Sequence, residues 1–217
     1  MSENLWPNVE HALSYLALAD TIPHRTEGEA TLLEVLPDRV ERILDLGTGD
    51  GRLLALVRTA CPGATGVAVD FSPPMLEAFA DRFAGVPETE VALVAHDLEL
   101  PLPTAVTDAG PFDVVVSSFA IHHLVDDRKR SLYAEAFALL RPGGVFANLE
   151  HVASPTPALH EAFRSALGIS DRPDDPSNIL APVEPQLSWL RDLGFADVDC
   201  FWKWRELALL AGTRSAT

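Results

Sequence analysis

The chain has 217 residues, 47% of them hydrophobic, which suits one sizeable core and is short for two full domains. Its 16 basic and 32 acidic residues give a formal net charge of −16, which should repel nucleic-acid phosphates and anionic lipid surfaces. Cys61 and Cys200 are too few for a disulfide scaffold. No basic segment leads into an apolar stretch, and no run nears the roughly 20 apolar residues of a membrane span. We therefore expect a single cytoplasmic domain over 1–217 that binds neither nucleic acid nor membrane.

The first elements are predicted to be helices. ALSYLALAD (12–20) has amphipathic spacing, and TEGEATLLEVL (26–36) starts a second helix that Pro37 ends. Thr26 and Glu29 are spaced as a capping box at its start. Residues 1–38 should therefore form N-terminal cap helices on the domain.

Short apolar strands and helical segments then alternate, which indicates parallel α/β units. Helices are expected to begin near Gly51, Pro73 and Asp127. The predicted strands are RILDL (42–46), TGVAVD (65–70), VALVA (91–95), FDVVVSS (112–118) and GVFANLE (144–150).

Beyond residue 150 the pattern changes. TPALHEAFRSAL (156–167) predicts a helix, and the Pro/Asp-rich loop after it makes 151–183 the expected cover of a ligand site. QLSWLRDLGF (186–195) predicts a helix ended by a glycine, and DVDCFWKWRELALLAG (197–212) alternates like a hairpin that adds an antiparallel end to the sheet. Trp202 and Trp204 share one face of that hairpin, as core or as a pocket wall.

Three alternating glycines, Gly47, Gly49 and Gly51, separate the strand at 42–46 from the next helix. Such a turn lets backbone approach a ligand closely. Asp70 ends the following strand, where a carboxylate can accept hydrogen bonds from ribose hydroxyls. Arg52 stands where a dinucleotide motif would need its third glycine, so a nucleoside is favoured over a pyrophosphate.

These motifs resemble class I, Rossmann-like S-adenosylmethionine-dependent methyltransferases over about residues 40–212. The resemblance implies a doubly wound, mostly parallel seven-stranded sheet with an antiparallel last strand. It also implies S-adenosyl-L-methionine as cofactor and S-adenosyl-L-homocysteine as product. The matching segments, in the family's order, are LDLGTGDG, GVAVDFSPPMLEAF, AHDLELPLP, FDVVVSSFAIHHL and LLRPGGVFANLE.

The resemblance also implies a set of cofactor-binding residues. The alternative is structural, because an aspartate at a strand end commonly caps a turn and Phe71 could belong to the core. The implied contacts are Asp45, Gly47, Gly49 and Ser117 at the methionine part, Asp70 at the ribose, and Phe71, Asp97 and Leu98 at adenine.

The expected reaction is O- or N-methylation of a small molecule in metabolism. Residues 117–123 lack the acidic ligand of magnesium-dependent relatives, so no metal is expected. His123, His122 and Glu150 resemble a proton-accepting group with its supporting acid, although paired histidines here can also be packing residues. The looser substrate-contact candidates are His24, Arg25 and His151. A tRNA-base methyltransferase and a noncatalytic cofactor-binding module remain alternatives, and a homodimer stays open.

Overall fold

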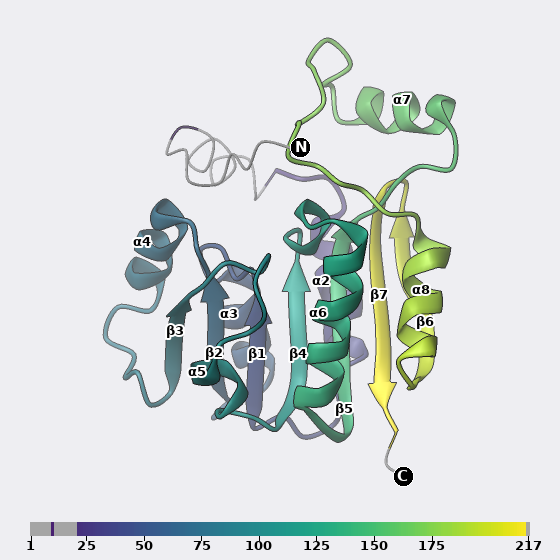
Figure 1. Ribbon diagram of the computed structural model, residues 1–217. Helices are drawn as coiled ribbons and strands as arrows, with labels where there is room; N and C mark the ends of the chain where they lie inside the picture. The colour runs from purple at the N-terminus through teal and green to yellow at the C-terminus, as the bar shows by residue number, and fades with distance from the viewer. Residues whose placement is uncertain (1–9, 11–20, 216–217) are drawn as a thin grey trace.

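The computed structural model describes residue 10 and residues 21–215 of the chain, so the helix predicted over 12–20 lies outside the described residues. Seven strands form one sheet in the order β3-β2-β1-β4-β5-β7-β6 (Figure 1). All neighbouring pairs are parallel except those of β7 with β5 and with β6. This confirms the predicted Rossmann-like sheet with its antiparallel last strand. The strands are β1 (Arg42–Leu46), β2 (Thr65–Asp70), β3 (Val91–Ala95), β4 (Phe112–Ser118), β5 (Leu140–His151), β6 (Phe195–Trp204) and β7 (Leu207–Arg214).

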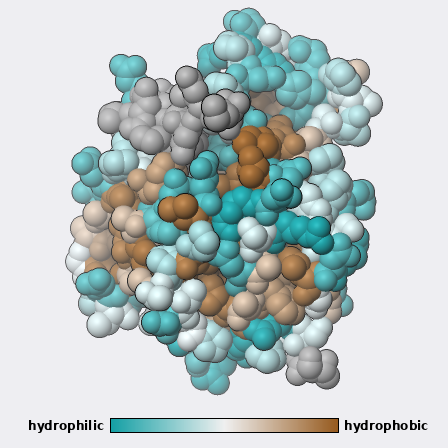
Figure 2. Space-filling view, in the orientation of Figure 1, coloured by the Kyte–Doolittle hydropathy of each residue, from teal (hydrophilic) through white to brown (hydrophobic). Residues whose placement is uncertain are grey.

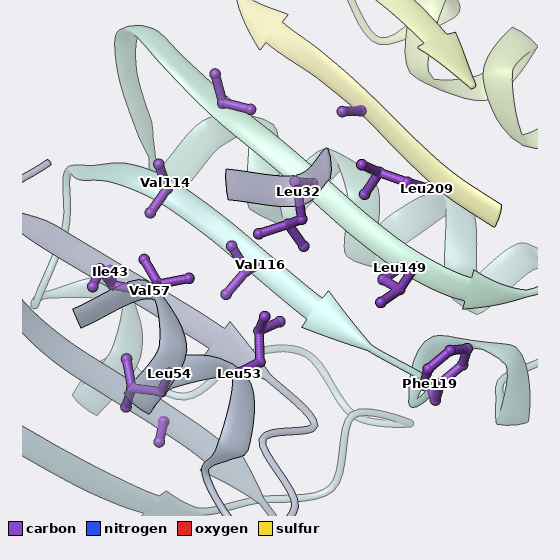
Figure 3. Packing of buried hydrophobic residues seen from close by; sticks show 14 of the residues in the cluster. Leu32, Ile43, Leu53, Leu54, Val57, Val114, Val116, Phe119, Leu149 and Leu209 are labelled. Carbon is purple, nitrogen blue, oxygen red and sulfur yellow. The ribbon is translucent and has the colours of Figure 1, made fainter. Parts of the chain in front are cut away.

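Helices cover both faces of the sheet. One apolar cluster joins the sheet to α2 (Arg25–Glu34), α3 (Arg52–Ala60) and α4 (Pro73–Arg82). Figure 3 shows part of it, with Leu32 close to Val116 of β4 and Val57 close to Ile43 of β1. A second cluster joins the other face to α5 (Thr104–Thr107), α6 (Asp126–Leu139) and α8 (Val183–Asp192). Because both faces are covered, β1 and β4 are buried along nearly their whole length, which explains their unbroken apolar sequences.

Two elements lie at the carboxyl end of the sheet. The short helix η1 (Ile121–His123) follows β4, and α7 (Pro157–Ala166) stands above the ends of β5 and β7 (Figure 1). Leu46 pairs with Val69 on one side and with Ser117 on the other, so β1, β2 and β4 end at the same level. The chain turns outward in opposite directions from β1, which makes this edge the expected ligand site of a doubly wound sheet.

Two local predictions are wrong. The helix predicted from Thr26 begins at Arg25, and the carboxylate of Glu29 accepts hydrogen bonds from the side chains of Arg25 and Arg52 instead of closing a capping box. The fifth strand begins at Leu140, not at 144, because a bulge between its first pairing and the pairing at Val145 absorbs the intervening residues.

The surface is mixed in character. Figure 2 shows hydrophobic residues in separate patches among hydrophilic ones on the face it presents. No helix among the described residues is long and apolar enough to cross a membrane.

Candidate active site

A pocket opens at the carboxyl ends of β1, β2 and β4. Its space, open solvent at the mouth included, is about 1000 Å³. Its walls come from the glycine turn, the ends of β2 and β3, the segment after β4 and one residue of the loop after α7. The lining residues are Arg25, Asp45, Gly47, Thr48, Gly49, Asp50, Arg52, Leu53, Asp70, Phe71, Met75, Asp97, Leu98, Glu99, Ser118, Phe119, Ala120, His123, Leu124 and Ser177.

The glycine turn is held tightly against its neighbours. Gly47 has a left-handed φ of 67°, and a Cβ there would lie 2.2 Å from the Cβ of Ala120. The amide of Thr48 donates to the carbonyl of Val69 at 2.9 Å. Only glycine permits both the left-handed φ and this close approach, so the turn explains the first glycine of the motif.

Asp70 binds the turn to the end of β2. Its Oδ2 accepts the amide of Gly49 at 2.8 Å, and its Oδ1 accepts the amides of Phe71 and Ser72 at 2.8 and 2.9 Å. Burial raises the pKa of this carboxyl, and the three amides partly offset that effect. Asp70 therefore caps a turn, as the structural alternative held, and also lines the pocket.

Two polar atoms in the pocket walls lack protein partners. Asp45 Oδ2 accepts the hydroxyl of Thr48 at 2.7 Å, but Asp45 Oδ1 and Ser118 Oγ are buried without a hydrogen-bond partner among the described residues. Burial raises the pKa of Asp45 to about 7. Buried polar atoms rarely stay unpaired, so both point to a polar ligand.

The structure brings most of the predicted cofactor residues together, with one correction. Ser117 is fully buried, and its hydroxyl donates to the carbonyl of Leu46 at 2.7 Å within the sheet. Ser118 lines the pocket instead, because successive side chains of a strand point to opposite faces. The predicted residues that do line the pocket are Asp45, Gly47, Gly49, Asp70, Phe71, Asp97, Leu98, Arg25 and His123.

Three other residues that line the pocket could not be predicted from the sequence. Phe119 precedes the histidine pair and has a left-handed φ of 51°, for which its residue type gave no signal. Ser177 belongs to the loop after α7, where no periodicity marks a position. Met75 reads equally well as a core residue of α4.

The remaining predicted residues lie outside the pocket lining. His24 stacks on Trp204 with ring centroids 4.5 Å apart. Trp202 and Trp204 pack against the apolar core, as one of the two alternatives proposed. His151 sits beside His122, with ring centroids 5.5 Å apart.

His122, His123 and Glu150 form one buried group. His122 Nδ1 lies 2.6 Å from Glu150 Oε1, and the rings of His122 and His123 have centroids 4.0 Å apart. His123 is the member that lines the pocket, and its Nδ1 lies 3.1 Å from the carbonyl of Ser177. Burial lowers the pKa of His123 to about 3 and the pKa of His122 well below its usual value. Both imidazoles are therefore neutral near pH 7.

A network of buried polar side chains supports Glu150. Asn148 Nδ2 donates to Glu150 Oε2 at 3.2 Å and lies 3.2 Å from the hydroxyl of Tyr133, which donates to Gln186 at 2.7 Å. Burial raises the pKa of Glu150 to about 7. Among the residues described, no group of three or more His, Cys, Asp or Glu side chains could hold a metal ion.

The fold and the glycine-lined pocket define a Rossmann-like methyltransferase. A family described as "Methyltransferase domain" matches residues 43–144. A demethylmenaquinone methyltransferase of Clavibacter sepedonicus is 34% identical over 185 residues, which cover 78% of this chain and 71% of that relative. The chain belongs to the class I S-adenosylmethionine-dependent methyltransferase family.

Other relatives agree with this assignment. A demethylmenaquinone methyltransferase of Thermus thermophilus is 38% identical over 125 residues, covering 57% of this chain and 53% of the relative. The chain thus spans about half the length of one of these relatives and 71% of the other. An O-methyltransferase family protein from Burkholderia thailandensis has the same fold, with a TM-score of 0.73 at 22% identity, over 100% of this chain and 63% of that one.

The pocket residues fit the cofactor of this family. The carboxylates of Asp45, Asp70 and Asp97 line the pocket, which suits a ligand with a sulfonium, an ammonium group and a ribose diol. The same carboxylates would repel a pyrophosphate. The unpaired Asp45 Oδ1 and Ser118 Oγ offer an acceptor and a hydroxyl to such a ligand.

Proposed function

We propose that this chain methylates a small molecule that carries an acidic ring hydroxyl, at that oxygen or at the adjacent ring carbon. The observation that carries the proposal is that His123 lines the same pocket as the glycine turn, together with the apolar residues Phe119 and Leu124. The sequence predicted O- or N-methylation, and the name of a further relative, a ubiquinone/menaquinone biosynthesis C-methyltransferase, adds carbon as a target.

The cofactor supplies a methyl group on a sulfonium sulfur, which keeps the electron pair of the broken bond and leaves as a neutral thioether. The protein has to hold the nucleophile in line with that methyl group and to exclude water. Phe119 and Leu124 supply an apolar wall for a planar ring, and Ser177 closes the same end of the pocket.

The acceptor hydroxyl must lose its proton as the new bond forms. His123 is neutral and able to accept it, but burial lowers its pKa to about 3, which makes it a weak base. A weak base assists the deprotonation of phenols and enols far more than that of alkyl alcohols. The basicity of His123 therefore favours an aromatic or enolic acceptor.

Cofactor binding is tested by calorimetry with S-adenosyl-L-homocysteine and with NAD. We expect saturable binding of the first only, and preference for NAD would overturn the assignment. Methyl transfer is then tested with labelled S-adenosyl-L-methionine and a panel of catechols, naphthoquinols, alkyl alcohols, amines and tRNA, with and without EDTA. Cofactor binding without any methylated product would favour the noncatalytic module, and methylated tRNA would favour the tRNA-base enzyme.

The base role is tested with His123→Ala on the acceptor that the panel identifies. We expect turnover to fall by about 10²-fold, the low end for general-base catalysis, because the lost base is weak. Cofactor affinity should stay within about twofold, since His123 is not among the residues predicted to bind the cofactor. Full activity of a folded variant across the neutral pH range would remove His123 from the chemistry.

A further inference from the structure

A buried carboxylate lies at the turn between β6 and β7. Glu206 has no solvent exposure, and two histidines from different elements lie within hydrogen-bond distance of its carboxylate oxygens. His151 Nε2, from the end of β5, lies 2.9 Å from Glu206 Oε2, and His160 Nδ1, from α7, lies 2.8 Å from Glu206 Oε1. Burial raises the pKa of Glu206, but hydrogen bonds from His151, Ser154 and His160 together lower it below its usual value, so the carboxylate stays ionised.

His160 bridges two carboxylates. Its Nε2 lies 3.2 Å from Asp174 Oδ2, on the loop that follows α7, while its Nδ1 faces Glu206. Arg164 ion-pairs with the same Asp174 and donates to the carbonyl of Ile169. The pKa of His160 is raised, with Glu206 the largest cause, which favours the charged imidazolium that donates at both nitrogens. Helix α7 and the loop after it are thus fastened to each other and to Glu206.

Few other contacts hold α7 to the sheet. Within α7, all of whose residues the structure describes, only Phe163 and Arg164 are buried. The Arg164 side chain donates to the carbonyl of Ile169 in the loop after α7, so this hydrogen bond does not tie α7 to the sheet. The ring of Phe163 packs 5.4 Å from His151 and 6.0 Å from Trp204. Figure 1 shows α7 set apart from the helix layers that flank the sheet. Phe163 and His160, one helical turn apart, therefore carry the attachment of α7.

A chain of side-chain contacts that begins with His151 connects the Glu206 carboxylate to the proposed reaction centre. The His151 ring lies beside His122, which adjoins His123 at the pocket wall. The loop after α7 returns to that wall, where Ser177 contacts His123. Helix α7 is thus held at Glu206, and the loop that follows it is held at His123.

We propose that Glu206 is a positioning residue, which through His160 fastens α7 and the loop that carries Ser177, and which fixes His151 beside His122. This inference rests on the proposed function, in which the acceptor lies next to His123. In a merely structural role, loss of the Glu206 charge would loosen the β6–β7 hairpin and leave α7 no more mobile than the hairpin.

The test compares three variants of the full chain: Glu206→Gln, His160→Gln and the control Glu161→Gln. Glu161 is an exposed neighbour on the same helix, so its variant removes one charge without touching the link to Glu206. Amide hydrogen exchange of 157–166 and of the β6–β7 hairpin reports attachment, and ¹⁵N chemical shifts of the imidazoles report the tautomer of His151. Calorimetry with S-adenosyl-L-homocysteine is run on each variant.

We expect amide exchange in α7 to rise about tenfold or more in Glu206→Gln and in His160→Gln, with the control unchanged. The hairpin should keep its protection in His160→Gln, and the single Nε2–H tautomer of His151 should be lost in Glu206→Gln only. Unchanged α7 exchange in His160→Gln, or equal loss of protection in α7 and hairpin in Glu206→Gln, would overturn the proposal. If the wild-type chain does not bind S-adenosyl-L-homocysteine, that result would instead count against the proposed function.

Discussion

Asp70 caps a turn of the fold and also lines the pocket, so we expect its carboxylate to bind a ligand as well. Its three backbone amide partners occupy only part of its accepting capacity. Asp70→Asn removes the charge and turns one accepting oxygen into a donor. Affinity for S-adenosyl-L-homocysteine should fall by about 10- to 100-fold, the scale of a hydrogen bond to a charged group, as measured by calorimetry at pH 8.

The matched control for this substitution is Asp81→Asn, on the exposed side of α4 and away from the pocket lining. It should leave affinity unchanged. If Asp70→Asn also binds at wild-type strength while folded, Asp70 is a structural cap only and leaves the cofactor site.

At the scale of elements, substitutions at two glycines distinguish the cost of left-handed backbone strain from the cost of steric overlap. Gly47→Ala places a side chain at a φ of 67° and 2.2 Å from the Cβ of Ala120, so strain and steric overlap add. Gly63→Ala meets the same left-handed strain, at φ 88°, with no atom within 4 Å. We expect the free energy of unfolding to fall by about 2–4 kcal/mol for the first and about 1 kcal/mol for the second, by urea denaturation.

Only the Gly47 variant should also weaken cofactor binding, because the overlap displaces the turn that lines the pocket. Equal losses of stability in the two variants would show that the Ala120 segment yields without cost. A stable Gly47→Ala protein with full cofactor affinity would contradict the tight packing of the turn.

Elements with regular periodicity were predictable, and contacts between distant elements were not. The strands at 42–46, 65–70, 91–95 and 112–118 have the predicted bounds. For 42–46 and 112–118 the reason is nearly continuous burial, which requires an apolar run in the sequence. Glu29 was misread because its partner Arg52 is on another helix. The shift from Ser117 to Ser118 depends on how the strand is rotated about its axis, which two adjacent serines do not reveal.

The same distinction applies to the candidate site. The sequence pattern was enough to place the glycines and Asp70 in the wall of one pocket, because strand ends meet at one edge of a parallel sheet. Ser177 and the bond between His160 and Glu206 join residues far apart in the chain, so no local pattern indicates them.

At the scale of the whole molecule, the buried titratable groups act on stability in opposite directions. His123 and His122 stay neutral in the folded chain while their unfolded forms, with a pKa of 6.5, take up protons, so they cost stability as the pH falls below 6.5. Asp45 and Glu150 have folded pKa values of about 7 against 3.8 and 4.5, so they bind protons in the folded state first and add stability as the pH falls below 7. Asp45 and Glu150 thus offset the two histidines, and Asp70 and His160, whose folded pKa values are also raised, add stability in the same direction as the two carboxyls.

The melting temperature should therefore not fall from pH 7 to 5, and Asp70 and His160 should raise it. Below about pH 3.8 Asp45 and Glu150 are mostly protonated in both states, and the two histidines act without that opposition, costing about 1.4 kcal/mol each per pH unit. Glu29 and Glu206, whose folded pKa values are lowered, add to that loss, because they take up protons in the unfolded chain first. Thermal unfolding followed by circular dichroism from pH 8 to pH 3.5 measures this profile.

Removing one of the opposing groups should change this profile. In Glu150→Gln the carboxyl no longer titrates, so its contribution is lost, and the melting temperature should fall relative to that of wild type as the pH drops from 6.5 to 5. Comparing each protein with its own value at pH 7 removes any constant cost of the substitution. A wild-type melting temperature that rises continuously down to pH 4 would show that the two histidines become charged inside the fold. A profile in Glu150→Gln that runs parallel to that of wild type would show that the carboxyl is ionised well below pH 7, which would make it the charge that supports His122 throughout the neutral range.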